Sequence, residues 1–449
     1  MKTVLLIDED AGARRGLKNF LASEGWTVWE AQDSEQGWAL AQQHHPRVVV
    51  FDYLLPEGSG IQLCRRFRDT PSFDGTILVA TSARDFPADR QNASEAGARH
   101  FLVKPFEPLA LKRLLENLAQ GDTTVFMKSF SSMIPEDAPT RLRFWGVRGS
   151  IPSPGPDTVR YGGNTSCVEI RTAGQIIILD AGSGIRPLGL ALAREFKGRP
   201  LELTLLITHT HWDHIQGFPF FVPAYNPMNT VRVLGYEGAS RGLQDTLSGQ
   251  MESPYFPIGL KEMPGNIQFT ELRDLEFAIG PIRVRATYVN HPGVCVGYRL
   301  FTPHGSITFI PDNENYVRLK SRSAGAQPIS PDAQAFAEQQ DQKLVEFIRN
   351  SDILIVDSQY DAEEYERHVG WGHSCVDDSV NLALRAEVKK LFLFHHDPSH
   401  DDRKIDAMAR HARKIAAASG RRLDVAGARE RLEVVLRPAV SRRALARAG

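Results

Sequence analysis

The chain has 449 residues, a length at which a single hydrophobic core normally gives way to two or more domains. Its composition, 42% hydrophobic and 24% charged residues, excludes a disordered or fibrous protein. The formal net charge of −1 provides no global attraction to nucleic acid or to anionic membranes, so any such role must rest on a local site.

Cysteine usage and the N-terminus both indicate a cytoplasmic protein. The four cysteines lie far apart and form no Cys-x-x-Cys pair, which predicts reduced thiols rather than disulfides or a thiolate zinc site. The apolar run before Asp8 is too short for a signal-peptide core, and no later run approaches the length of a membrane span. We therefore expect a cytoplasmic chain with no membrane segment.

The first 121 residues alternate short apolar runs with amphipathic stretches of helical period. Strands separated by helices of this length predict a parallel sheet with helices on both faces. The expected strands are Val4–Ile7, Val48–Phe51, Ile77–Ala80 and Phe101–Val103.

Polar side chains follow the expected strands of this region: Asp8 and Glu9, Asp52, Ser82, and Lys104. Side chains at the carboxyl ends of parallel strands converge at one edge of the sheet. A carboxylate can accept a phosphoryl group only when a metal and a cation offset the negative charge. We expect Asp52 to be the nucleophile, Asp8 and Glu9 to hold Mg²⁺, Lys104 to be the cation, and Ser82 or its neighbour Thr81 to supply the hydroxyl.

The segments LLIDED, VVVFDYLLPEGSG, ILVATSA and FLVKPF occur in an order that resembles the response-regulator receiver domain. The resemblance implies a flavodoxin-like fold and phosphorylation of Asp52 by a cognate histidine kinase. It also places Phe101 where the family has a switch aromatic, while the acidic pair is Asp-Glu instead of Asp-Asp. The alternative is a degenerate receiver kept for dimerisation.

The composition and the hydrophobic periodicity of the chain change after residue 121. Residues 122–140 lack a clear period and are rich in Ser, Thr, Pro and Asp, which predicts a linker. A second domain is expected over 141–437, and the small, basic residues 438–449 are interpreted as a flexible tail. No DNA-binding domain is predicted.

Residues 141–437 combine short apolar strands with four helical stretches, which predicts a layered α/β sandwich. The expected helices lie near Leu188–Phe196, Gln334–Arg349, Val376–Ala386 and Arg403–Ser419. The insertion 314–349 is expected to be a lid or a contact with the receiver domain. The aromatic run Phe218–Tyr225 is interpreted first as buried packing or a dimer contact, and second as a nucleobase platform.

A histidine and aspartate motif follows the expected strand Leu203–Thr208. Side chains two apart on an extended segment point the same way, so His209 and His211 can bind one ion while Asp213 and His214 turn toward a second. Three histidines and an aspartate at these offsets are not expected by chance, so the motif predicts a metal site.

Further ligands are expected at later strand ends, because a two-metal site needs about three more groups, including a bridging carboxylate. The candidates are His291, Asp312 and His395. This order resembles the metallo-β-lactamase superfamily, which implies an αββα sandwich. By that resemblance His209, His211 and His291 hold one metal, Asp213, His214 and His395 the other, and Asp312 bridges them; His396 is the alternative to His395. Zinc is the favoured ion, with manganese or iron as alternatives.

Three segments resemble the branch of that superfamily that contains transfer-RNA 3′-processing nucleases and cyclic phosphate or cyclic nucleotide phosphodiesterases: WGVRGSIPSPG…RYGGNTSCVEI, NHPGVCVGYRL and Gly-His-Ser at 372–374. The resemblance makes His373 the general acid, so that His373 and the ligand Asp213 are the candidate catalytic residues. Where the nucleases have a His-Glu-Ala-Thr-like segment this chain has Asp357-Ser358-Gln359-Tyr360, and Asp357 or Asp361 could replace the glutamate.

These patterns together predict a dinuclear metal phosphodiesterase for a small, cyclic nucleotide-like substrate, controlled by phosphorylation of Asp52. A homodimer is a family-level expectation. The alternatives are hydrolysis of lactones, thioesters or β-lactams, and a catalytically silent scaffold that senses metal or nucleotide.

Overall fold

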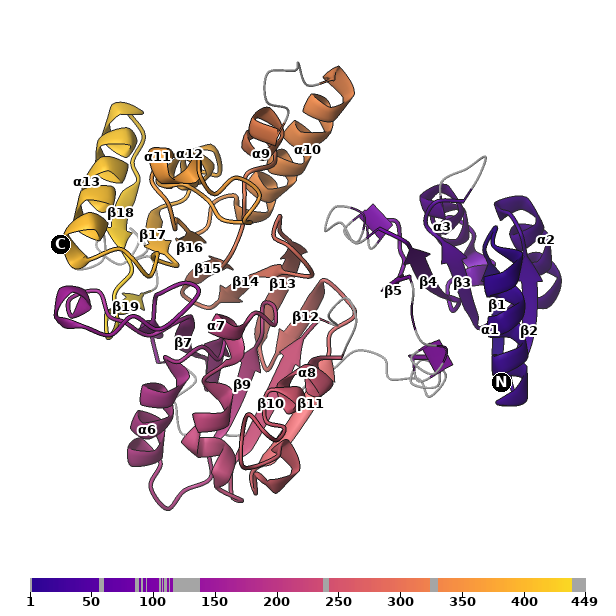
Figure 1. Cartoon of the computed structure of the whole chain (residues 1–449), viewed down its shortest axis with the longest axis horizontal. Helices are drawn as coiled ribbons and strands as arrows, with labels where there is room; N and C mark the ends of the chain where they lie inside the picture. Colours follow the sequence, from indigo (N-terminus) through magenta and orange to yellow (C-terminus); the bar gives the residue numbers. More distant parts are fainter. Residues whose placement is uncertain are drawn as a thin grey trace, which may run out of the picture. The chain divides into compact units, whose positions relative to one another are not determined.

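The computed structural model describes residues 2–55, 60–84, 89, 92–93, 95–104, 106, 108, 111–112, 114–115, 138–236, 242–323 and 330–437. The chain forms two compact units, one comprising Met1–Val125 with Arg273–Leu275 and the other comprising Phe126–Leu272 and Glu276–Gly449 (Figure 1). The predicted tail 438–449 and the linker residues 122–137 lie outside the described residues. The predicted domain limits, 1–121 and 141–437, stay predictions.

The smaller unit is built on a five-stranded sheet in the order β2-β1-β3-β4-β5, and every pair of neighbouring strands is parallel. Its strands are β1 (Thr3–Ile7), β2 (Thr27–Ala31), β3 (Val48–Asp52), β4 (Ile77–Ser82) and β5 (His100–Val103). Its named helices are α1 (Ala11–Ser23), α2 (Ser34–His44) and α3 (Gly60–Arg68). This strand order confirms the predicted flavodoxin-like class.

The helices of this unit begin where a side chain can satisfy their free N–H groups. Asp10 accepts hydrogen bonds from the N–H groups of Gly12 and Ala13 at the start of α1, and Asp33 accepts one from Gln36 at the start of α2. Strand β1 ends at Ile7 and helix α1 begins at Ala11, so Asp8 lies at the carboxyl end of β1, two residues before the capping residue Asp10.

The larger unit contains two seven-stranded sheets. The first has the order β11-β10-β9-β8-β7-β6-β19 and the second β12-β13-β14-β15-β16-β17-β18. The strands of the first are β6 (Thr140–Gly146), β7 (Cys167–Thr172), β8 (Gln175–Leu179), β9 (Glu202–Leu206), β10 (Thr230–Gly235), β11 (Asn266–Glu271) and β19 (Glu433–Leu436). Those of the second are β12 (Glu276–Ile279), β13 (Ile282–Tyr288), β14 (Val296–Thr302), β15 (Gly305–Ile310), β16 (Ile353–Asp357), β17 (Lys390–Phe394) and β18 (Asp424–Gly427).

Helices cover the outer face of each sheet, which confirms the predicted αββα sandwich (Figure 1). On the first sheet lie α6 (Ile185–Glu195), α7 (Trp212–Ile215) and α8 (Leu243–Gly249), and on the second α9 (Tyr316–Ser323), α10 (Pro331–Ile348), α11 (Ala362–Tyr365), α12 (Val376–Arg385) and α13 (Asp402–Ala418). Between the sheets, Phe144 of β6 packs edge-on against Phe392 of β17, and its ring centroid lies 6.2 Å from that of Phe394. No helix in the described part of the chain is long and apolar enough to cross a bilayer.

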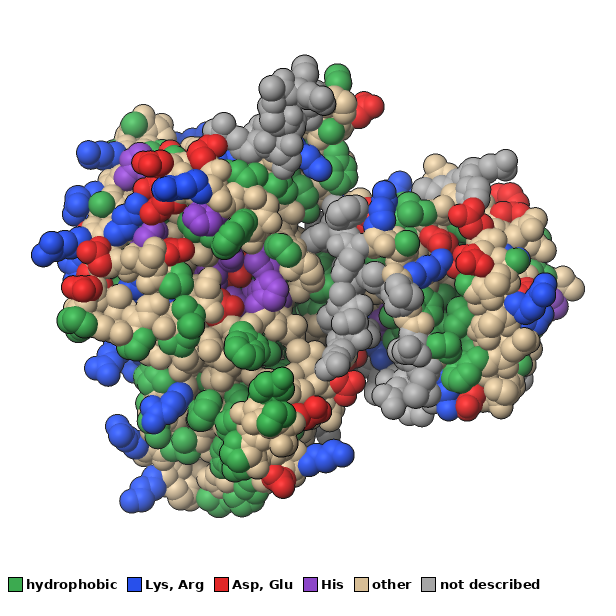
Figure 2. All heavy atoms as spheres, in the orientation of Figure 1, with side chains coloured by type: hydrophobic (Ala, Val, Ile, Leu, Met, Phe, Trp, Pro, Cys, Tyr) green, Lys and Arg blue, Asp and Glu red, His purple; other side chains and the backbone are tan. Residues whose placement is uncertain are grey.

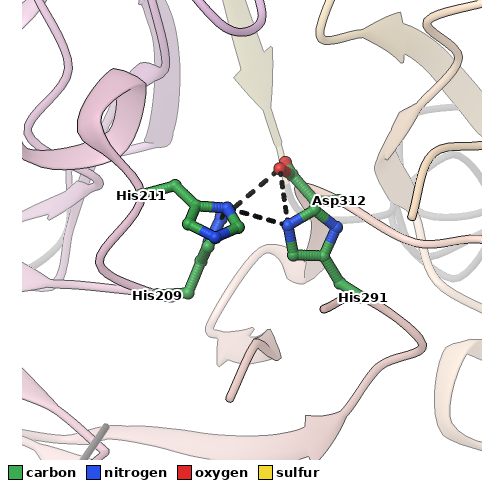
Figure 3. Close-up of side chains that lie close together, drawn as sticks. All are labelled: His209, His211, His291 and Asp312. Atoms are coloured by element: carbon green, nitrogen blue, oxygen red, sulfur yellow. Dashed lines mark hydrogen bonds and ion pairs between the residues drawn. The ribbon is translucent and has the colours of Figure 1, made fainter. Parts of the chain in front are cut away.

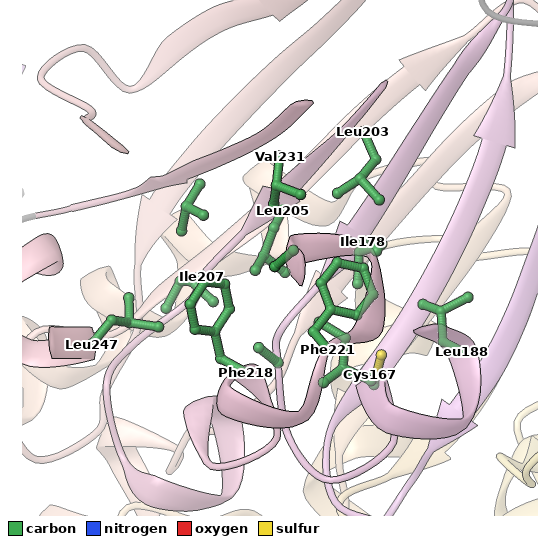
Figure 4. Packing of buried hydrophobic residues seen from close by; sticks show 14 of the residues in the cluster. Cys167, Ile178, Leu188, Leu203, Leu205, Ile207, Phe218, Phe221, Val231 and Leu247 are labelled. Atoms are coloured by element: carbon green, nitrogen blue, oxygen red, sulfur yellow. The ribbon is translucent and has the colours of Figure 1, made fainter. Parts of the chain in front are cut away.

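A buried cluster fills the space between the first sheet and its helices (Figure 4). Phe218 and Phe221 are fully buried there, whereas Phe220 is 52% exposed and packs edge-on against Phe256. Burial of a phenylalanine contributes about 1.5–3 kcal/mol, so these two rings anchor the segment that follows the metal-binding motif. The aromatic run is therefore mainly a packing element.

The insertion 314–349 forms a helical hairpin in its described part. Ser330 caps α10, and the Asp341 carboxylate on α10 accepts hydrogen bonds from the N–H groups of Tyr316 and Val317 at the start of α9. Burial raises the pKa of Asp341 to about 6. One buried carboxylate thus joins the two helices.

Candidate functional site

The predicted receiver residues come together at the carboxyl edge of the five-stranded sheet. The ammonium group of Lys104 lies 2.5 Å from Oδ2 of Asp8 and also pairs with Oδ2 of Asp52. Burial lowers the pKa of Lys104, but hydrogen bonds to Asp52 and Asp8 outweigh it and raise that pKa. The N–H of Lys104 donates to the carbonyl of Ser82 at 2.7 Å, while Glu9 is exposed beside Asp8.

The two hydroxyl candidates differ in their partners. Oγ of Ser82 accepts a hydrogen bond from the N–H of Arg84, and Oγ1 of Thr81 donates to the carbonyl of Phe51 at 3.3 Å. Both side chains are buried. Phe101 packs edge-on against Tyr53, with ring centroids 5.7 Å apart.

A first group of four donors gathers where β9, β13 and β15 end (Figure 3). Nδ1 of His211 lies 3.1 Å from Nε2 of His209 and 2.9 Å from Nε2 of His291. Oδ2 of Asp312 lies 3.4 Å from Nε2 of His209 and 3.7 Å from Nε2 of His291. All four donor atoms lie within 4.8 Å of one another, a spacing that a single ion can span.

A second group comprises Asp213, His214 and His395. Oδ2 of Asp213 lies 3.0 Å from Nε2 of His395 and 3.2 Å from Nε2 of His214. Oδ1 of Asp312 lies 3.3 Å from the Nε2 atoms of both histidines. The two oxygens of Asp312 therefore face different groups, which is the arrangement of a carboxylate shared between two ions.

The donor set fits two divalent cations on its own chemistry. Among the described residues, Nε2 of His214 and Oδ1 of Asp312 are buried and make no hydrogen bond. Buried polar atoms normally find partners, so these two atoms indicate a ligand. In Figure 2 a group of histidine side chains lies in a hollow of the larger unit, with Asp or Glu side chains beside it.

Burial and neighbouring charges together set the pKa values of the histidines in the cluster. Burial lowers the pKa of His214, but Asp213, Asp312 and Asp180 outweigh it and hold that pKa well above its usual value. Burial and the neighbouring His209 lower the pKa of His211 to about 4. An imidazole that stays neutral at pH 7 can act as a metal ligand.

His395 and His396 point in different directions. His395 has a left-handed backbone with φ 60° and faces the donor cluster, whereas Nε2 of His396 bonds the carbonyl of Ala428 at 2.8 Å. Burial lowers the pKa of His396 to about 3. Ser150 and Asp180, next to the same cluster, also have positive φ angles. Such conformations cost about 1–3 kcal/mol each and persist where the surrounding structure imposes them.

Several residues to which the sequence analysis gave no role orient the donors. Asp180 accepts from Nδ1 of His214 at 2.7 Å, Gln359 from Nδ1 of His395 at 3.0 Å, and the carbonyl of Gly372 from Nδ1 of His291 at 2.9 Å. These partners fix which imidazole nitrogen faces the ions. Asp180 directly follows β8, so its position at a strand end was a usable signal, whereas Gln359 and Gly372 lie in segments noted for their neighbours Asp357 and His373.

Gly149 is required for the position of His395. A Cβ atom at Gly149 would lie 2.4 Å from Cε1 and Nδ1 of the His395 ring. We expect Gly149→Ala to weaken metal binding by about 10–100-fold, as loss of an orienting contact does. Competition with a chelator measures it. Gly155→Ala in the same loop is the matched control, because its Cβ would meet no described atom within 4 Å; equal affinities would contradict the prediction.

His373 forms a pair with Asp357 beside the donor cluster. Nδ1 of His373 lies 3.0 Å from Oδ2 of Asp357, and its ring lies 4.9 Å from that of His395 and 5.2 Å from that of His291. Burial lowers the pKa of His373, but Asp357 outweighs it and raises that pKa to about 9. Asp361, in contrast, caps α11 and pairs with Lys404. The geometry therefore selects Asp357 over Asp361 as the carboxylate partner.

Comparison with known proteins defines the class of each region. The family described as the response regulator receiver domain matches residues 4–116, and the beta-lactamase superfamily domain matches residues 176–396. The chain therefore joins a response regulator receiver domain to a domain of the beta-lactamase superfamily.

Individual relatives match only parts of the chain. Response regulator MprA of Mycobacterium sp. (strain KMS) is 36% identical over 115 residues, which is 26% of this chain and 48% of the relative. This chain thus spans about half the length of the curated response regulators that it matches. The metallo-beta-lactamase fold protein YhfI from Bacillus subtilis aligns at 14% identity and a TM-score of 0.46, covering 66% of this chain and 99% of YhfI.

Proposed function

We propose that the protein is a metal-dependent phosphodiesterase for small phosphodiesters, with its activity controlled by phosphorylation of Asp52. The observation that carries the proposal is the His373–Asp357 pair, which lies against His291 and His395 of a donor set suited to two cations. The assignment of ligands is part of the proposal: His209, His211 and His291 for one ion, Asp213, His214 and His395 for the other, and Asp312 for both.

Two divalent ions held in this set, with zinc favoured and manganese or iron as alternatives, would polarise the phosphoryl oxygens and supply a nucleophilic water at neutral pH. The protein contributes the geometry. Asp180 and Gln359 hold His214 and His395 in one orientation, and Asp312 offers one oxygen to each group of donors. Of the seven donor residues His211 alone is exposed, so the cluster meets solvent at His211.

His373 is proposed to protonate the leaving oxygen. Asp357 accepts from Nδ1, so Nε2 is the nitrogen left to face a substrate. Asp357 is itself held by the N–H groups of Asn313, Ser374 and Gln359, which keeps the pair in place. An alkoxide is a poor leaving group unless it is protonated as it leaves. A histidine held in a fixed position can supply that proton during hydrolysis of a phosphodiester.

Turnover of a substrate panel tests the proposal. The panel contains bis-p-nitrophenyl phosphate, cyclic nucleotides, a lactone, a thioester and a β-lactam, with metal content measured on the same sample. Phosphodiester turnover that disappears with the metals would support the proposal. Metal-loaded protein that hydrolyses only the other esters would replace it with that alternative, and metal-loaded protein that turns over nothing would favour a sensing scaffold.

Control by Asp52 is tested separately. A cognate histidine kinase is the proposed phosphoryl donor. Mg²⁺ would be held by Asp8 and Glu9, and Lys104, which pairs with both Asp8 and Asp52, would supply the cation that offsets the charge of the incoming phosphoryl group. We expect an acyl-phosphate donor to change the diesterase rate of the wild type by at least about fivefold, the usual lower range of a coupling energy between two sites. Asp52→Ala should not respond. An identical response in the two proteins would remove the control.

A further inference from the structure

Two exposed tryptophans stand beside the open side of the metal-binding cluster. Of its seven donor residues His211 alone is exposed, so the cluster meets solvent there. Trp212 follows His211 directly and is 72% exposed; Trp371 is 61% exposed. Exposed aromatic side chains that gather at one site mark binding surfaces, and both of these indoles belong to segments that carry or contact the donor residues.

A short series of contacts connects the two tryptophans. Nδ1 of His211 lies 2.9 Å from Nε2 of His291, and Nδ1 of His291 lies 2.9 Å from the carbonyl of Gly372, the residue after Trp371. A Cβ atom at Gly372 would lie 2.4 Å from Nδ1 of His291. Trp212 is therefore next in sequence to the ligand candidate His211, and Trp371 is next to the residue whose carbonyl contacts the ligand candidate His291.

The backbone that carries Trp371 is fixed by a buried carboxylate. Glu314, which is 1% exposed, accepts hydrogen bonds from the N–H groups of Gly370 and Gly372 at 2.9 Å each, one on either side of Trp371. The hydroxyl of Tyr365 donates to the same carboxylate at 2.5 Å. With φ angles of 87° and 84°, the two glycines adopt a backbone that other residues rarely adopt. The turn that carries Trp371 therefore has a fixed backbone conformation.

The indole ring of Trp371 is also supported. It packs edge-on against His368 with ring centroids 4.9 Å apart, and His368 stacks on Tyr360 at 4.4 Å with the rings 11° from parallel. Tyr360 is buried and its ring packs edge-on against His373 at 6.2 Å. The exposed ring therefore stands on an aromatic stack that reaches the proposed acid.

We propose that Trp371 and Trp212 form a stacking subsite for a planar aromatic ring, so that the preferred substrates are phosphodiesters that carry a nucleobase. The inference rests on the proposed function and deepens it: the cations take the anionic phosphate, and the indole faces take the base. Stacking of a base on an aromatic side chain is sequence-tolerant, so the subsite predicts a preference for nucleotides as a class over alkyl phosphodiesters.

The test compares two cyclic diesters that differ only in the base, adenosine 3′,5′-cyclic monophosphate and methyl riboside 3′,5′-cyclic phosphate, with hydrolysis followed by phosphorus NMR. We expect kcat/KM of the metal-loaded, full-length wild type to favour the nucleotide by about tenfold or more. Trp371→Ala should remove most of that preference by raising KM for the nucleotide, and Trp371→Phe should retain it. Trp212→Ala should act in the same direction. Tyr255→Ala, which removes an 83% exposed ring from another loop, is the matched control.

A wild type with no preference, or Trp371→Ala that slows both diesters equally, would overturn the subsite. If neither diester is hydrolysed, the proposed function fails and binding decides the subsite instead. Calorimetric titration of adenosine monophosphate and methyl phosphate then applies, and equal affinities of the wild type and Trp371→Ala for adenosine monophosphate would overturn it.

Discussion

Replacement of Asp312 by asparagine is expected to leave at most one metal ion per chain and to lower phosphodiester turnover by more than the roughly 10–100-fold typical of an orienting residue. Oδ2 of Asp312 faces His209 and His291, and Oδ1 faces His214 and His395. Asparagine keeps the shape of the side chain but removes its charge and turns one oxygen into an NH₂ donor, which cannot ligate a cation.

Metal content per chain and kcat/KM on the same sample measure this effect. Asp361→Asn is the control, because Asp361 caps α11 and pairs with Lys404 and takes no part in the donor groups. We expect Asp361→Asn to keep two ions and near-normal turnover. Asp312→Asn with two tightly held ions would show that Asp312 is not the shared ligand.

The decrease in hydrolysis rate that follows replacement of His373 is expected to depend on the leaving group of the substrate. For a cyclic nucleotide, whose leaving group is an alkoxide, His373→Ala should lower kcat by about 10²–10⁴-fold, the usual contribution of a general acid. For bis-p-nitrophenyl phosphate the loss should be small, because p-nitrophenolate leaves without protonation. Asp357→Asn should fall between wild type and His373→Ala with the nucleotide, since it keeps the imidazole but weakens the contact with Nδ1.

The ratio of the two rates is the measurement that separates acid catalysis from a structural role. His411→Ala serves as the control, because His411 is about half exposed and pairs with Asp377 on the surface of α12 and α13. Equal losses on both substrates in His373→Ala would mean that His373 only shapes the site. Unchanged metal content in that variant would exclude an indirect effect through the ligands.

Both predictions concern residues that the sequence brought forward through strand-end position and motif order. The motif His209 to His214 could be interpreted locally, because its donors lie within six residues and an extended segment places alternate side chains on one side. His291 and Asp312 each follow an apolar run that becomes a strand. The helices expected near residues 188, 334, 376 and 403 occur as α6, α10, α12 and α13 with limits shifted by a few residues.

The partners of these residues could not be predicted in the same way. Glu314 and Gly372 are separated by 58 positions, and Gln359 and His395 by 36, so nothing in the local pattern connects them. The burial of Phe218 and Phe221 against the exposure of Phe220 likewise depends on which side of a short turn faces the core.

Residue types, their spacing and the motif order they form thus predicted the two-domain class and brought forward the receiver and metal-binding candidates, because most of these candidates follow a strand whose period the sequence displays. The choice of Asp357 over Asp361 as the partner of His373 came only from the tertiary structure, whereas the preference for His395 over His396 was already implied by the family resemblance. Neighbouring side chains at a strand end diverge with a single backbone angle, such as the φ of 60° at His395, and that angle is set by packing against residues far along the chain.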